Sequence, residues 1–173
     1  MHRRATPWRG IYDITPDDTI SEMLRGVEAH YVGAAHTHLS LDQQVGRWRV
    51  FNPGSVGMPL DGLAGASYAI LDGDADGWRA TFRRVDYDRA PIFEQFDRIG
   101  FDASVDRVAR LIMEEFRSFR PNVYSFHQWC RHHVPDQPFS DALIDTFLQA
   151  PDRWAFLQPH YHLNFDTETS PGD

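Results

Sequence analysis

The residues of this chain best suited to chemistry are two histidines one position apart, His36 and His38, in an Ala-His-Thr-His stretch. Neutral imidazole nitrogens are common metal ligands. The pair follows an apolar segment that we expect to form a strand over residues 31–35, and the rings should diverge where that strand turns into a loop. The pattern therefore predicts metal-assisted chemistry at a strand end, although such pairs also occur as ordinary surface or core residues.

Composition limits the other possibilities. The chain has 173 residues, 42% of them hydrophobic, which is enough for one domain of ordinary size. A net charge of -8 argues against a general nucleic-acid surface, which needs clustered basic residues. No apolar run approaches the ~20 residues of a membrane-spanning helix, and no signal segment stands at the start. The single Cys130 cannot form an internal disulfide, so we expect a cytoplasmic protein with no membrane partner.

The elements that must position the histidines follow from periodicity. Apolar residues at helical spacing after Asp17 and Asp18, which could cap the helix, predict a short helix ending near His30. Alternating and apolar runs then predict strands. The expected strands cover residues 31–35, 47–51, 66–72 and 78–87, and the last two should pair as a hairpin.

The connection between those last two strands, residues 72–77, imitates the start of an EF-hand calcium loop, with Asp at alternate positions and Gly at the sixth. The twelfth position is Arg83, where a calcium loop needs a bidentate Glu. The flanks are also strand-like, where helices are required. We therefore predict a solvated hairpin turn and assign no calcium site.

The character of the chain changes to helical after residue 87. Three apolar stripes predict three helices. Ser104 could cap the second of these helices, and Pro121 should end it. The last residues are polar and lack periodicity. The expected organisation is a domain over residues 1–87, a helical extension packed on it over 88–166, and a disordered tail over 167–173.

Two motifs together resemble a known family. The Ala-His-Thr-His stretch that ends at His38 is similar to the Gly-His-Thr-His box of calcineurin-like metallophosphoesterases, and the Asn-Pro-Gly-Ser-Val-Gly stretch from Asn52 is similar to the loop that follows it there. The Ala-Ser-Tyr-Ala-Ile-Leu run from Ala66 also resembles the next strand in the small bacterial phosphodiesterase branch. The resemblance covers roughly residues 30–87 and is more specific than either motif alone.

This resemblance implies the C-terminal half of a four-layer αββα sandwich, followed here by the helical extension, in an α+β fold. It implies a hydrolase in which two divalent ions, commonly Mn, Fe, Zn or Ni, act on a phosphate ester substrate. By matching positions, His36 would bind the second metal and His38 the first. The loop of Asn52, Gly54, Ser55 and Gly57 would form a tight turn near the site, with both glycines in unusual dihedrals.

The sequence also departs from the family pattern. Ala35 replaces a Gly, Ser40 a Pro, and Leu60 stands where an Arg is common. Each change could perturb the loops. Ala35 is tolerable if its φ is negative, because a Cβ makes positive φ costly by about 1 kcal/mol or more.

Several family motifs have no match in residues 1–31. These are the Asp-x-His, Gly-Asp and Gly-Asn-His boxes, which supply the bridging carboxylate, an Asn ligand and a phosphate-contacting histidine. His2, upstream of Pro7, is a candidate remnant of the family's His-Gly-Ser/Thr-Pro segment and would be a third imidazole ligand. Neutral imidazoles alone leave two adjacent dications without a negative ligand. We therefore expect a divalent metal at incomplete occupancy.

Two functions stay open at this point. In the first, the chain is the C-terminal portion of a phosphoesterase, truncated or in need of a missing N-terminal half. In the second, it is a noncatalytic binding or assembly module derived from one, and an exposed sheet face would favour a homodimer. The remaining histidine pairs, His132-His133 and His160-Tyr161-His162, are expected to be surface or interface residues.

Overall fold

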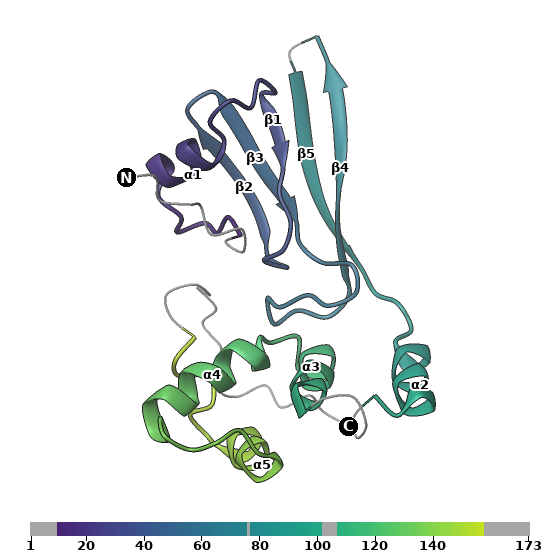
Figure 1. The fold of residues 1–173 in the computed structure, drawn as a ribbon. Helices are drawn as coiled ribbons and strands as arrows, with labels where there is room; N and C mark the ends of the chain where they lie inside the picture. The colour runs from purple at the N-terminus through teal and green to yellow at the C-terminus, as the bar shows by residue number, and fades with distance from the viewer. Residues whose placement is uncertain (1–9, 76, 102–106, 158–173) are drawn as a thin grey trace. The chain divides into compact units, whose positions relative to one another are not determined.

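The structure is a computed structural model that describes residues 10–75, 77–101 and 107–157. The chain divides into two compact units. The first runs to Leu60 and includes Ala64–Tyr87, and the second comprises Asp61–Leu63 and the chain from Asp88 onward. Among the described residues the first unit holds one helix and five strands and the second holds four helices (Figure 1). The fold is therefore mixed α+β.

The first unit is built on a three-stranded sheet of β1 (Tyr31–Gly33), β2 (Ser40–Val45) and β3 (Trp48–Pro53), in the order β1-β3-β2. β3 pairs with β2 in an antiparallel hairpin and with β1 in parallel. Since β1 and β3 run in the same direction, their carboxyl ends lie at the same edge of the sheet. The segments that leave these two strands therefore start side by side.

The helix α1 (Asp17–Met23) packs on one face of this sheet. Its Ile20 is fully buried, as is Val50 of β3. Burial of an aliphatic side chain of this size contributes about 1.5–3 kcal/mol relative to exposure. The core of the unit consists of Ile11, Ile20, Leu24, Leu41, Val45 and Val50.

The opposite face of the sheet meets an antiparallel hairpin of β4 (Ala66–Asp74) and β5 (Gly77–Val85), whose register ends with Asp74 opposite Gly77. The predicted hairpin is confirmed. The Tyr31 hydroxyl accepts a hydrogen bond of 2.9 Å from the Trp78 backbone N–H. Tyr31 and Val32 alternate along β1, so the hairpin and α1 lie on opposite sides of the sheet. The first unit thus has the layer order helix, sheet, hairpin.

The second unit contains α2 (Ala90–Ile99), α3 (Arg107–Ser118), α4 (Asn122–His133) and α5 (Asp141–Gln149). Three of these helices, α2, α3 and α5, match the predicted apolar stripes, and the break at Pro121 is confirmed, but α4 was not predicted as a separate helix. The Ser140 side chain accepts a hydrogen bond from Leu143 N–H and so caps α5. The core of this unit consists of Leu111, Phe126, Trp129, Leu143, Ile144 and Phe147.

A buried carboxyl group joins two of these helices. Glu115 of α3 is 5% exposed, and its Oε1 accepts a hydrogen bond of 2.9 Å from the Val123 backbone N–H in the first turn of α4. Burial raises the pKa of Glu115 to about 7, although hydrogen bonds from the Val123 and Asn122 backbones act in the opposite direction. The carboxyl group therefore changes its charge near neutral pH.

The structure of the first unit differs from the sequence analysis in three respects. The first helix ends at Met23 and not near His30, because the chain turns at Leu24 and Gly26 takes a positive φ of 85°. Its N-cap is Pro16, with no side-chain cap from Asp17 or Asp18. Strand β2 was not predicted, since its two buried residues, Leu41 and Val45, are four positions apart and the residues between them are polar.

Some predictions lie outside the described residues, namely the cap at Ser104 and the tail over residues 167–173. Among the helices that the structure describes, none is long and apolar enough to cross a membrane.

Candidate functional site

The two motifs singled out in the sequence lie at the shared carboxyl edge of β1 and β3. The Ala34 N–H donates a hydrogen bond of 2.7 Å to the Phe51 carbonyl, so the strands stay paired up to the points where the motifs begin. The segment with His36 and His38 follows β1, and the turn that begins at Asn52 closes β3. Parallel pairing therefore brings together two stretches that are separate in sequence.

Both histidines adopt a backbone conformation that is unusual for their type. The φ angle is 79° at His36 and 61° at His38. Left-handed backbone costs a non-glycine residue about 1 kcal/mol or more, and such residues concentrate at functional sites. Among the described non-glycine residues, Phe119 alone shares a positive φ, and Ala35 is not in this group. Ala35 can therefore replace the family's glycine without this strain.

The His38 ring is held by a backbone carbonyl. Its Nδ1 lies 2.7 Å from the Met58 carbonyl oxygen. Since a carbonyl oxygen only accepts, Nδ1 carries the proton and donates it, and in the neutral ring Nε2 presents a lone pair. Histidines that bind metals are commonly oriented in this way by a partner on the other nitrogen. His36 is exposed, and His38 is partly buried.

Asn52 connects the two motifs directly. It has no exposed surface, its Nδ2 donates to the Thr37 hydroxyl oxygen at 3.0 Å, and its Oδ1 accepts from the Gly54 N–H at 3.0 Å. One side chain thus fixes both the residue between the histidines and the tight turn. Gly54 has a φ of 88°, as expected for this turn.

The rest of the turn is held by serine hydroxyls. The Ser55 Oγ accepts from the Met58 N–H at 3.0 Å and so holds the residue whose carbonyl group, on its other side, accepts from His38. Ser40, where the family has Pro, lies 3.2 Å from the Ser67 hydroxyl and donates to the Pro53 carbonyl. This departure from the family pattern therefore ties β2 to the turn.

The expectation for Gly57 was wrong. Its φ is not in the positive range, and an added Cβ would meet nothing within 4 Å. The Gly57 carbonyl accepts a hydrogen bond from the Tyr87 hydroxyl at 3.3 Å, an interaction that other residues could also make. Leu60, where the family commonly has Arg, is buried and adds no charge to the site.

Three contributors to the site gave no signal that sequence reasoning used. Thr37 is 2% exposed although both its neighbours reach the surface. Gly10 lies against it, since a Cβ on Gly10 would be 2.3 Å from the Thr37 Cγ2 and 3.5 Å from the His36 Cδ2. The Met58 contribution is a backbone carbonyl, which no sequence pattern reveals. The only available hint was the polar threonine between the two histidines.

The donor set is at most part of a metal centre. His38 offers Nε2, and His36 stands two positions away on the same loop. His2 lies outside the described residues, and those residues contain no group of three or more His, Cys, Asp or Glu that could hold a metal ion. A dinuclear centre needs carboxylate ligands to offset the repulsion of two dications. The described residues therefore fit an imidazole contribution and not the complete centre.

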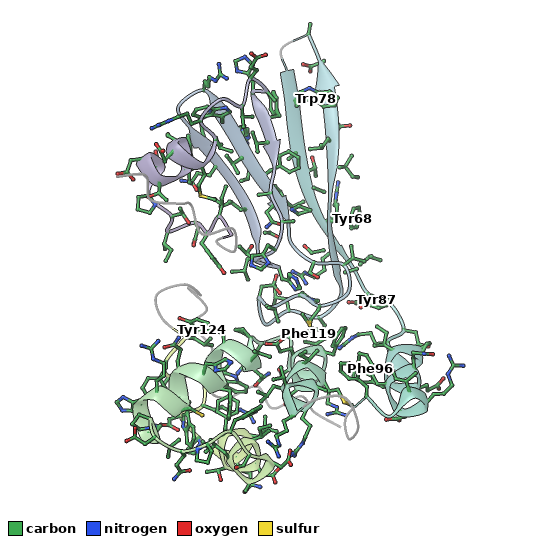
Figure 2. The ribbon with its side chains drawn as sticks, in the orientation of Figure 1. Tyr68, Trp78, Tyr87, Phe96, Phe119 and Tyr124 are labelled. Carbon is green, nitrogen blue, oxygen red and sulfur yellow. The ribbon has the colours of Figure 1, made fainter. Side chains whose placement is uncertain are left out.

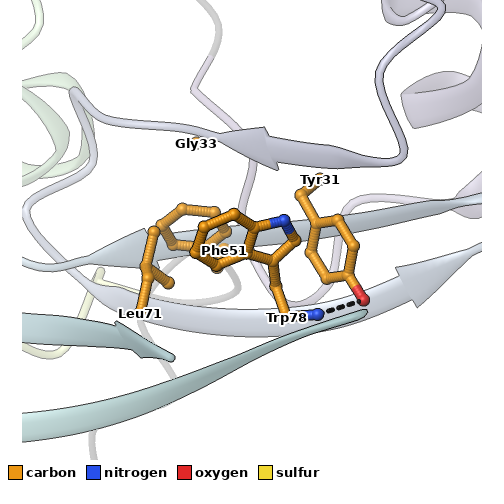
Figure 3. A pocket seen from close by; sticks show the side chains of 5 residues that line it. All are labelled: Tyr31, Gly33, Phe51, Leu71 and Trp78. Carbon is orange, nitrogen blue, oxygen red and sulfur yellow. Dashed lines mark hydrogen bonds between the residues drawn. The ribbon is translucent and has the colours of Figure 1, made fainter. Parts of the chain in front are cut away.

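A separate cavity of about 180 Å³ lies between the sheet and the hairpin, lined by Tyr31, Gly33, Phe51, Leu71 and Trp78 (Figure 3). Its walls are mostly apolar, and the Tyr31 hydroxyl is already bonded to the Trp78 N–H. It contains neither histidine of the pair. We assign it no chemistry.

The other histidine pair of the described chain is on the surface, as expected. His132 and His133 end α4 and are exposed. The His133 Nε2 lies 2.8 Å from an Asp152 carboxylate oxygen, whose partner oxygen accepts from the Trp129 indole N–H. This arrangement fastens the segment after α5 to α4. His160 and His162 lie outside the described residues.

Comparison with known proteins adds little. No protein-family model matches the chain, and no curated protein matches it. Among solved structures, the crystal structure of a hypothetical protein from Pyrococcus horikoshii OT3 is similar, with 28% sequence identity and a TM-score of 0.44. The match covers 59% of this chain and 39% of that one, so the chain spans about two fifths of its length. That protein carries no stated activity, and the function must be argued from the site.

Proposed function

We propose that this chain is part of a metal-dependent phosphoesterase of the calcineurin-like superfamily, and that His36 and His38 are two of its imidazole ligands. The observation that carries the proposal is the His38 ring, whose Nδ1 is bonded to the Met58 carbonyl so that Nε2 is left as a donor. The left-handed backbone of both histidines supports it, because strain of this kind is retained where a site needs it.

The layer order of the first unit also supports the proposal. Helix, sheet and hairpin follow one another as they would in half of an αββα sandwich. Both motifs lie at the carboxyl ends of parallel strands, where sites of folds with parallel strands are commonly found. The superfamily assignment itself rests on the motif resemblance.

Metal ions bound at such a site would lower the pKa of a bound water and offset the charge of the phosphoryl oxygens. This chain's own residues have narrower tasks. His36 and His38 would bind the metal through ring nitrogens. The Met58 carbonyl keeps the His38 proton on Nδ1, and Asn52 holds the two loops together. The negative ligands that a dinuclear centre needs would have to come from residues other than the described ones.

Metal binding by single-histidine variants tests the proposal. Isothermal titration with Zn²⁺ or Mn²⁺ should show binding that His38→Ala or His36→Ala abolishes. His30→Ala is the matched control, because His30 is an exposed histidine at the other end of β1 whose Nδ1 also lies near a carbonyl oxygen, that of Arg47, at 3.3 Å. Loss of binding in the His30 variant alone, or equal binding in all variants, would contradict the proposal.

The second candidate function is a noncatalytic binding or assembly module. Exposed apolar side chains on the hairpin favour it (Figure 2). Trp78 is 53% exposed, Ile70 44% and Tyr68 39%. Hydrolysis of a chromogenic phosphodiester with added Mn²⁺ separates the two functions. Turnover that His38→Ala abolishes defeats the noncatalytic module, whereas inactivity together with concentration-dependent dimerisation in sedimentation experiments supports it.

A further inference from the structure

We infer that Thr37 is a positioning residue, which holds His36 and His38 in the geometry of their proposed role. The inference rests on the proposed function of the two histidines. Thr37 stands between two residues of positive φ and is itself 2% exposed. Its side chain points inward while His36 reaches the surface, so its fixation determines where the adjoining peptides project the two rings.

The Thr37 hydroxyl is the polar half of this anchor. Its oxygen accepts a hydrogen bond of 3.0 Å from the Asn52 amide and one of 3.3 Å from the Leu39 backbone N–H. Asn52 is fully buried and in turn accepts from Gly54, at the start of the neighbouring turn. Loss of the Thr37 oxygen would leave the buried Asn52 amide without this acceptor, which is costly for a group away from water.

The Thr37 methyl group is the apolar half. It lies where a Cβ on Gly10 would come within 2.3 Å of it, so the backbone of Gly10 packs directly against Cγ2. The side chain is thus held from two directions, by the Asn52 amide on its oxygen and by Gly10 on its methyl. A side chain fixed on both sides keeps one rotamer.

Two substitutions separate these halves. Thr37→Val keeps the shape and the β-branch but removes the oxygen, and Thr37→Ser keeps the oxygen but removes the methyl. Thr146→Val is the matched control for the change of residue type, because Thr146 lies exposed on α5 and its hydroxyl donates to the Ala142 carbonyl of the same helix. Asn52→Ala removes the amide that donates to the Thr37 hydroxyl. This variant replaces Thr37→Val in the test if Thr37→Val does not fold.

Two readouts are measured on the full chain. The first is the affinity for Ni²⁺ alone by titration calorimetry. The second is the set of imidazole nitrogen signals of His36 and His38 in long-range proton–nitrogen spectra without metal, which reports tautomer and ring order. Backbone spectra show that each variant is folded. The second readout would not respond to a merely structural loss of stability.

Thr37→Val and Asn52→Ala should weaken Ni²⁺ binding by about 10-fold or more, the loss typical of groups that orient metal ligands. They should also turn the single Nδ1-protonated state of His38 into an averaged one. Thr37→Ser should stay within about threefold of the wild type, and Thr146→Val should match it. A folded Thr37→Val protein with wild-type affinity and wild-type His38 signals would overturn the inference.

The two proposals fail in distinguishable ways. A wild-type chain that binds no Ni²⁺ contradicts the proposed function. The His38 signals of Thr37→Val and Thr37→Ser then still decide whether Thr37 positions the ring, because that comparison needs no metal.

Discussion

The Met58 carbonyl oxygen and the His38 Nδ1 lie 2.7 Å apart, across a separation of 20 residues. This hydrogen bond ties the loop after β1 to the turn after β3. It also decides which ring nitrogen of neutral His38 keeps a lone pair. The chemistry available at His38 therefore depends on where the Met58 peptide is placed.

Ser55→Ala should loosen Met58, whose N–H lies one peptide group before the carbonyl that accepts from His38. The Ser55 hydroxyl accepts the Met58 N–H at 3.0 Å, and loss of a hydrogen bond of this kind costs about 1 kcal/mol. We expect a loss of stability of about that size, from denaturant unfolding, and metal binding that is several-fold weaker. Ser40→Ala is the control, because the Ser40 hydroxyl bonds to the Pro53 carbonyl on the same turn without reaching Met58. Equal losses of metal affinity in both variants would contradict a specific role for Ser55.

Gly10→Ala should destabilise the first unit. The added Cβ would lie 2.3 Å from the Thr37 Cγ2, far inside van der Waals contact, and forced overpacking typically costs about 1–3 kcal/mol. Thermal unfolding measures the loss.

Two further variants check the cause. Thr37→Ser removes the clashing methyl, so the Gly10→Ala/Thr37→Ser double variant should regain much of the stability that Gly10→Ala loses. Gly57→Ala should be nearly neutral, since its Cβ would meet no atom within 4 Å and its φ is not positive. A Gly57 variant as unstable as Gly10→Ala would mean that glycine substitution in itself, and not the contact with Thr37, is responsible.

Much of the first unit followed from local sequence signals. The hairpin was predicted because its strands alternate and its acidic, glycine-containing turn suits a reversal. Strand β2 was missed because half-buried Gln43 lies midway between Leu41 and Val45, where strict alternation would place a third apolar residue. The Gln43 Nε2 donates instead to the Asp17 carboxylate of α1. Helix α1 was extended too far because its apolar spacing continues past Gly26, whose positive φ ends it.

The sequence predicted that the two motifs lie together, but not the residues that support them. The proximity of His36, His38 and Asn52 followed from the motifs, and the Gly54 dihedral followed from the turn. The contact between Gly10 and Thr37 joins residues 27 positions apart through shape alone. Such a packing relationship leaves no periodic trace in one sequence, since neither residue type is unusual where it stands.

The stability of the second unit should depend on pH through Glu115. Its pKa is raised from 4.5 to about 7, chiefly by burial, so the folded state binds the proton more tightly than the unfolded state. The resulting stabilisation is complete below pH 4.5 and is lost as the pH rises to 7. The loss in the free energy of unfolding is on the order of 3 kcal/mol.

Glu115→Gln should flatten this profile, because the amide oxygen can still accept the Val123 N–H and carries no charge at any pH. Denaturant unfolding between pH 4 and 8, followed by tryptophan fluorescence, measures the free energy of unfolding at each pH. Glu114→Gln removes a carboxylate at the next position on α3 and is the control. If both variants keep the wild-type slope between pH 4.5 and 7, Glu115 is not the source of the pH dependence.

The most direct test of the central claim is a Zn²⁺ titration of the full chain, followed through the imidazole nitrogen signals of every histidine. We predict that the His38 Nε2 and one nitrogen of His36 shift together, while the His38 Nδ1 keeps its proton and its bond to Met58. Signals of His36 and His38 that stay unchanged at saturating Zn²⁺, or a His38 ring that binds through Nδ1, would contradict the account.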